Sequence, residues 1–155
     1  MKLEFLFQGL LNGAVLAAVA FLLSRFTKDA VGRAVLALWL VGAAAMYVLF
    51  AVRAGEGAGP IVGEIVGVAL YGAVALRGLR GSPMWLAAGW ALHPVWDIAL
   101  HYFGPGATFA PEKYTVSCLT YDLAVAVYIV VAYRTGLVGM PHCGPANAQG
   151  ARSGY

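Results

Sequence analysis

The chain has 155 residues, of which 61% are hydrophobic and only 11% are charged. Soluble domains of this size seldom tolerate such a composition, because a small globule needs a charged surface to stay dispersed. The few charged residues also lie mostly between long apolar segments. This distribution argues against a soluble enzyme, a disordered chain, a disulfide-rich secreted module and a nucleic-acid-binding protein, and it predicts an all-α membrane protein.

Five segments have the roughly 20-residue apolar length that crosses the hydrocarbon core of a bilayer. In chain order they are residues 5–24, 34–52, 60–76, 84–103 and 116–133. We therefore expect residues 1–135 to form a single domain, a compact bundle of five transmembrane helices. Residues 136–155 are rich in Gly, Pro, Ser and Asn, and we expect them to be a flexible cytoplasmic tail.

The basic residues in the short connections predict how the bundle is oriented, since Lys and Arg are enriched in cytoplasmic loops. One side of the predicted bundle collects seven of them, namely Arg25, Lys28, Arg33, Arg77, Arg80, Arg134 and Arg152. The other side holds three, namely Lys2, Arg53 and Lys113. We therefore expect a multi-pass protein of the cell's inner (plasma) membrane, with the N-terminus outside and the C-terminus in the cytoplasm.

The first two spans contain no charged residue, but each of the last three contains polar ones. The third span carries Glu64, about one helical turn below the predicted outer boundary. On the same span Gly63 and Gly67 form a G-x-x-x-G pair, which predicts the close approach of another helix.

The fourth span carries His93, Asp97 and His101 at positions i, i+4 and i+8, which lie on one stripe of a helix. Pro94 within this span removes a backbone donor and predicts a kink. The fifth span carries Asp122, with Cys118 one turn above it.

These polar groups fall in the outer half of the predicted bundle, so we expect them to meet in a single site. An ionised carboxylate near the middle of a bilayer costs several kcal/mol, so such residues are normally paired and functional. Three carboxylates and two imidazoles can offset that cost by binding a cation or by sharing protons. The set comprises Glu64, His93, Asp97, His101 and Asp122.

Helix geometry restricts how these residues could bind a metal ion such as zinc, iron or manganese. His93 and His101 lie about 12 Å apart along the helix axis and do not readily share one small ion. A single ion would use Asp97 with either histidine, together with Glu64 and Asp122. Two ions bridged by carboxylates also fit this ligand set. The alternatives to metal binding are a purely structural role, in which the residues hydrogen-bond between helices, a proton relay and the binding of a small polar ligand.

Four further side chains are expected to surround the polar residues. They are Cys118, Tyr71, Tyr121 and Trp90. Cysteine could be a soft ligand or a small buried hydrophobe, and the two tyrosine hydroxyls are placed to orient carboxylates.

The chain resembles a family of small bacterial integral membrane proteins whose function is uncharacterised. The resemblance rests on R-G-L-R at residues 77–80, G-W-x-L-H-x-x-W-D-x-x-x-H at residues 89–101 and C-x-x-x-D at residues 118–122. It covers spans three to five and implies no activity, cofactor or catalytic residue. In the family pattern a second histidine precedes the one matching His101, and here that position is Leu100. The stripe is also loosely similar to the His/Asp sets of intramembrane zinc hydrolases and di-iron lipid hydroxylases.

The leading functional hypothesis is a metal-dependent enzyme that acts on a lipid or another hydrophobic small molecule in the bilayer. In this hypothesis Asp97, His101, Glu64 and Asp122 hold the metal, and His93 is a ligand or a general base. One alternative is a metal-free acid–base isomerase or cyclase of an isoprenoid-like substrate. Another is a non-enzymatic membrane subunit or small transporter with a proton relay, within a homo-oligomer or a larger membrane complex.

Overall fold

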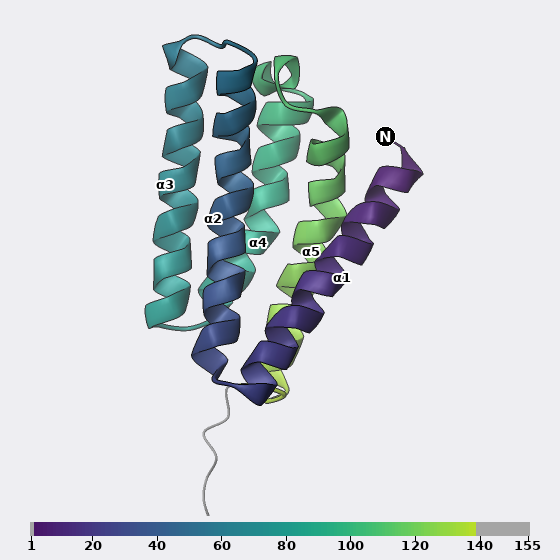
Figure 1. The fold of residues 1–155 in the computed structure, drawn as a ribbon, viewed down its shortest axis with the longest axis vertical. Helices are drawn as coiled ribbons and strands as arrows, with labels where there is room; N and C mark the ends of the chain where they lie inside the picture. Colours follow the sequence, from purple (N-terminus) through teal and green to yellow (C-terminus); the bar gives the residue numbers. More distant parts are fainter. Residues whose placement is uncertain (1, 139–155) are drawn as a thin grey trace, which may run out of the picture.

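The computed structural model describes residues 2–138, and within this range the regular structure is entirely helical. The five main helices are α1 (Leu3–Phe26), α2 (Asp29–Arg53), α3 (Ala58–Arg80), α4 (Met84–Asp97) and α5 (Glu112–Arg134) (Figure 1). A π-helical turn, η1 (Ile98–Tyr102), continues α4, and a 3₁₀ helix, η2 (Pro105–Thr108), lies in the connection to α5. The predicted all-α class is confirmed, whereas most of the predicted C-terminal tail lies outside the described residues.

Four of these helices, α1, α2, α3 and α5, are long and apolar enough to cross a membrane. Helix α4 has only 14 residues, about 21 Å of α-helix, which is shorter than a hydrocarbon core of roughly 30 Å. The five residues of η1 extend it. The fourth segment predicted from the sequence is therefore built from two kinds of helix, and length and composition support four of the five predicted spans.

The helices run alternately up and down, so the connections fall at two ends of the bundle (Figure 1). We call these the α1–α2 end and the α2–α3 end, after the connections found there. The first helix packs chiefly against α5, and its N-terminal half diverges from α2 (Figure 1). Large side chains without exposed surface fill the centre of the bundle, among them Leu40, Leu86, Trp90 and Ile129.

Glycines permit the close packing of α1 on α5. A Cβ at Gly9 would collide with a backbone oxygen of α5, and one at Gly13 would lie 2.5 Å from another. The sequence-based expectation placed such an approach at Gly63 and Gly67 instead. That expectation was wrong for Gly63, where an added Cβ would have no atom within 4 Å, while Gly67 faces the ring of Trp96 at 3.2 Å.

Basic residues gather at the α1–α2 end, where α1, α3 and α5 finish and α2 begins. Arg33 forms an ion pair of 2.9 Å with Asp29 and donates a hydrogen bond of 3.5 Å to the carbonyl oxygen of Gly81. The hydroxyl of Tyr133 donates to Asp29 at 2.7 Å. These contacts tie α2, α5 and the α3–α4 connection together at the more basic end of the molecule.

The backbone departs from α-helical geometry close to the polar residues. Helix α4 continues through Pro94, and the change to π-helix comes after Asp97. The amide of Phe103 donates to the carbonyl of Ile98, five residues earlier, at 3.1 Å. Such π-helical turns are rare and occur frequently at functional sites.

Candidate functional site

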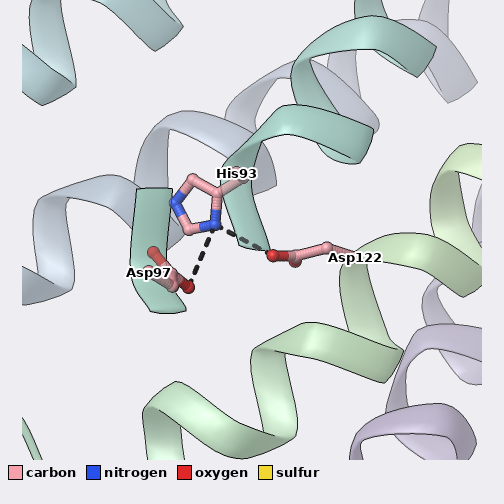
Figure 2. Close-up of side chains that lie close together, drawn as sticks. All are labelled: His93, Asp97 and Asp122. Atoms are coloured by element: carbon pink, nitrogen blue, oxygen red, sulfur yellow. Dashed lines mark hydrogen bonds and ion pairs between the residues drawn. The ribbon is translucent and has the colours of Figure 1, made fainter. Parts of the chain in front are cut away.

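His93 and Asp97 on α4 and Asp122 on α5 form a buried cluster that we call the triad (Figure 2). The imidazole Nδ1 of His93 lies 2.9 Å from Oδ2 of Asp122 and 3.3 Å from Oδ2 of Asp97. All three side chains have 0% exposed surface. The histidine therefore stands between two carboxylates that come from different helices.

Local sequence and packing explain why the triad forms. The i, i+4 spacing puts His93 and Asp97 on one face of α4, which packs closely against α5. Trp90, Val125 and Ile129, all without exposed surface, fill the next layer towards the α1–α2 end. The triad is thus closed by apolar side chains on that side and is held in a low-dielectric environment.

The other two predicted site residues form a separate pair towards the α2–α3 end. Nε2 of His101 lies 2.9 Å from Oε1 of Glu64 on α3. The ring of Tyr47 stacks on the imidazole with a centroid distance of 3.6 Å and an interplanar angle of 9°. Gly106 of η2 also packs against this imidazole, and a Cβ there would collide with the ring. The connection between α4 and α5 therefore covers the pair.

Asp97 links the triad to this pair. Its Oδ1 lies 4.0 Å from Nδ1 of His101, while its Oδ2 faces His93. Carboxylates and imidazoles thus alternate along one line through the bundle, in the order Asp122, His93, Asp97, His101 and Glu64. The structure brings together all five residues that sequence reasoning assigned to one site, but it divides them into a triad and a pair.

Several buried polar atoms of this cluster have no hydrogen-bond partner among the described residues. Within the triad these are Nε2 of His93, both carboxylate oxygens of Asp97 and Oδ1 of Asp122. Beside it are Nδ1 of His101 and the hydroxyls of Tyr47 and Thr115. Each unsatisfied buried polar group costs about 1–3 kcal/mol, and more if it is charged. Such a concentration in one place is expected where further protons, water or a cation complete the interactions.

The triad could hold a metal ion. One ligand atom from each residue can be chosen so that all three lie within 4.8 Å of one another. Ligands at about 2.1 Å from an ion are roughly 3–3.5 Å apart, which agrees with the separations of 2.9 and 3.3 Å around Nδ1. Two carboxylates and a neutral imidazole also balance the charge of a divalent cation, so the occupied site would be neutral.

The four surrounding side chains are placed differently from one another. Tyr71 packs the edge of its ring against His93 with a centroid distance of 4.8 Å, and Cys118 is buried one turn before Asp122. Trp90 is fully buried, and its ring lies 5.7 Å from that of Tyr121. Within residues 2–138 neither tyrosine hydroxyl makes a hydrogen bond to a carboxylate, so the expected orienting role is not seen.

Sequence reasoning missed two residues next to the site. Tyr47 stacks on His101, and its hydroxyl is buried, as is that of Thr115 on α5. There was little reason in the sequence to single out Tyr47, because it is a lone tyrosine in a predicted span that contains no charged residue. It does fall in the half of α2 that lies at the depth of Glu64, which could have drawn attention to it.

No curated protein and no solved structure matches this chain. A family of unknown function, DUF6010, matches residues 8–135. This range includes the triad, the Glu64–His101 pair and nearly all of the five main helices. The match agrees with the resemblance to an uncharacterised family, and the chain belongs to the DUF6010 family of unknown function.

Proposed function

We propose that this protein is a membrane-embedded, metal-dependent enzyme that acts on a lipid or another hydrophobic small molecule. The observation that carries the proposal is the triad, in which His93, Asp97 and Asp122 offer ligand atoms within 4.8 Å of one another and without exposed surface. Asp97 has no exposed surface and makes no hydrogen bond within residues 2–138, and its nearest imidazole nitrogens lie 3.3 and 4.0 Å away. In the interior of a membrane protein such a carboxylate needs a counter-charge or a proton. A divalent cation supplies the counter-charge for both aspartates at once.

The proposal includes an orientation in the membrane. All five helices cross the bilayer, with α4 and η1 forming one composite span, and the basic α1–α2 end faces the cytoplasm. The N-terminus and the Glu64–His101 pair then lie towards the outside of the plasma membrane. The positions of Lys and Arg support this orientation, because more of them lie at the α1–α2 end than at the α2–α3 end.

The ligand set favours zinc or manganese over iron. Catalytic zinc sites commonly present three protein ligands and leave the fourth position to water, as a triad of one histidine and two aspartates would. Mononuclear iron oxygenases typically use two histidines and one carboxylate, and in this structure the second histidine is paired with Glu64. A metal held by these three residues would supply Lewis-acid chemistry, which lowers the pKa of water and suits the hydrolysis of a carbonyl or ester group.

The protein residues would then position and move protons. His93 binds the ion or accepts a proton from the water, and Asp97 receives a proton from either neighbouring imidazole. The Glu64–His101 pair extends this path to the rim of the bundle, since Glu64 retains 7% of its surface exposed. A buried reaction centre would in this way exchange protons with the aqueous phase.

Elemental analysis tests the proposal on protein purified without affinity metals. We expect about one equivalent of zinc or manganese per wild-type chain, none in Asp122→Asn, and an unchanged content in the matched control Glu64→Gln. Absence of metal from the wild-type protein would overturn the proposal and leave the metal-free isomerase or cyclase as the surviving enzyme hypothesis. Loss of metal from Glu64→Gln alone would overturn the assignment of the ion to the triad.

The alternating line of five groups favours a second candidate function, a proton relay in a small transporter. Successive groups along it are 2.9, 3.3, 4.0 and 2.9 Å apart. The line reaches only about 12 Å from His93 to His101 along the axis, however, and beyond the triad the neighbouring layer is apolar. It is therefore suited to delivering protons to a central site. Acidification of proteoliposomes that is abolished by Glu64→Gln would favour the transporter instead.

A further inference from the structure

A groove on the surface of the bundle lies between α1, α2 and α5. Its cavity of about 530 Å³ falls within the usual range of small-molecule sites, roughly 300–1,000 Å³. The residues that line it come from the N-terminal half of α1, from α2 and from α5. Figure 1 shows that this half of α1 diverges from α2. The lining residues include Asn12, Trp39, Gly42, Tyr114, Cys118 and Tyr121.

The groove is mainly apolar but contains polar groups on α5 and on α1. The Tyr114 hydroxyl donates to the carbonyl of Ala43 at 3.2 Å, which closes one part of the groove by joining α5 to α2. Within residues 2–138, neither the Asn12 amide nor the Tyr121 hydroxyl makes a hydrogen bond, although both line the cavity. Two hydrogen-bonding side chains are thus open to a ligand.

The surroundings of the groove indicate what kind of molecule enters it. All three helices that form it are long and apolar enough to cross a membrane. Leu38 and Trp39 on its rim keep 67% and 53% of their surface exposed, as expected for side chains that face hydrocarbon. A ligand that reaches this groove from the bilayer is a hydrocarbon chain, and one with a hydroxyl or carbonyl can satisfy Asn12 or Tyr121.

The groove lies next to the cluster formed by the triad and the Glu64–His101 pair. Cys118 lines it and lies one turn before Asp122 on α5. Tyr114 also lines it, and its ring packs edge-on against Tyr47 at 5.5 Å, which in turn stacks on His101. A group bound in the groove is therefore separated from His101 by the side chains of Tyr114 and Tyr47, and it lies beside Cys118, one turn from Asp122.

We infer that this groove binds a single-chain membrane amphiphile that carries a hydroxyl or carbonyl group, and that this amphiphile belongs to the substrate class. The second part rests on the proposed function, whereas the binding itself does not require a metal.

Two glycine substitutions provide a matched test of the groove. An added Cβ at Gly42 or at Gly72 would have no atom within 4 Å, so a side chain can begin at either position without a collision. We expect both leucine variants to fold. Of these two glycines, Gly42 lines the groove, whereas Gly72 lies on α3, away from it. The probes are a long-chain alcohol with a photoactivatable diazirine in its chain and the corresponding hydrocarbon without the hydroxyl. Purified protein in bicelles is labelled with each, and the labelled peptides are mapped by mass spectrometry.

We expect labelling by the alcohol to concentrate on peptides from α1, α2 and α5. Gly42→Leu should reduce it at least about tenfold, and Gly72→Leu should leave it unchanged. Asn12→Leu should remove a preference for the alcohol over the hydrocarbon of about two- to tenfold, the value of one hydrogen bond. Equal labelling of the two glycine variants, or labelling spread evenly over α3, would overturn the inference.

Chelator-treated protein separates this inference from the proposed function. Unchanged labelling of chelator-treated protein supports the groove, since binding needs no ion. Specific labelling of a protein that contains no metal would support the binding groove and overturn the proposed metal-dependent enzyme. A stoichiometric metal together with nonspecific labelling would support the proposed metal site and overturn the proposed binding of an amphiphile in the groove.

Discussion

Replacing Asp97 by asparagine should change the stability of the protein in opposite directions with and without metal. In chelator, the fully ionised triad has two negative carboxylates and at most one positive imidazole, so one negative charge lacks a partner. Asp97 has no exposed surface and no hydrogen bond to either oxygen within the described residues. Asparagine removes the unpaired charge and keeps the shape of the side chain, so the metal-free variant should be more stable than the wild type.

The expected magnitude follows from the burial of this carboxylate. A charged aspartate at the centre of a membrane helix costs about 2.5–3.5 kcal/mol on insertion scales. Uptake of a proton lowers that cost, so Asp97→Asn should raise the free energy of unfolding in chelator by about 1–3 kcal/mol. With metal at 1,000 times its dissociation constant, the wild type should gain about 4.1 kcal/mol. The variant lacks one of three ligands and should gain little, so the order of stability reverses.

Reversible unfolding of both proteins in bicelles, with chelator and with zinc or manganese, measures these four free energies. Asp97→Glu keeps the charge and serves as the control, because it should not gain stability in chelator. If Asp97→Asn is destabilised equally in both conditions, the carboxylate acts as a structural hydrogen-bonding group. The electrostatic reasoning would then be refuted, and the metal proposal would lose its main physical argument.

Three further mutational experiments test the packing of the cluster and the bundle. Gly13→Ala should destabilise the protein by about 1–3 kcal/mol, because its Cβ would lie 2.5 Å from a backbone oxygen of α5, whereas Gly72→Ala should be neutral or slightly stabilising in an unfolding titration. Tyr47→Ala should cost about 3–5 kcal/mol in the same assay and Tyr47→Phe less than about 1, since the stacked ring is retained and an unpaired hydroxyl is removed. In a double-mutant cycle, Glu64→Leu and His101→Leu should together cost less than the sum of the single changes, because each single change leaves a buried partner unpaired. An additive cycle would contradict a direct interaction.

The level of each polar residue along the bundle could be worked out from the sequence, but the neighbouring side chain that it faces could not. Glu64 and His101 were expected at similar depth, and their side chains are 2.9 Å apart. Which carboxylate faces which imidazole depends on how α3, α4 and α5 pack, and on the π-helical turn that contains His101. Hydrophobic periodicity carries no information about that turn, so the division into a triad and a pair could not be foreseen.

Close packing was predicted at Gly63 and Gly67 on α3, where only Gly67 packs against a neighbouring side chain, and the close approach of α1 to α5 was not predicted. A G-x-x-x-G pair permits close approach but does not require it, and Gly63 faces open space while Gly13 packs against α5. Tyr47 was missed because a single tyrosine in an apolar span usually reflects packing or the membrane interface. Only the tertiary structure shows its ring stacked on His101.

The charges of the five polar groups lead to one further expectation, the number of protons that metal binding releases. The cluster contains three carboxylates and two imidazoles, and as a buried group it is most stable when its net charge is zero. Without metal, neutrality requires three protons; with a divalent ion it requires one, which the Glu64–His101 pair can hold.

Binding of one ion should therefore release about two protons. Calorimetric titration in buffers of different ionisation enthalpy measures this number. In Glu64→Gln the metal-free cluster needs two protons and the metal-bound cluster none, so the release should remain two. A value near zero would mean that the cluster is already ionised before the metal binds, and that its unpaired carboxylate oxygens are satisfied by other groups.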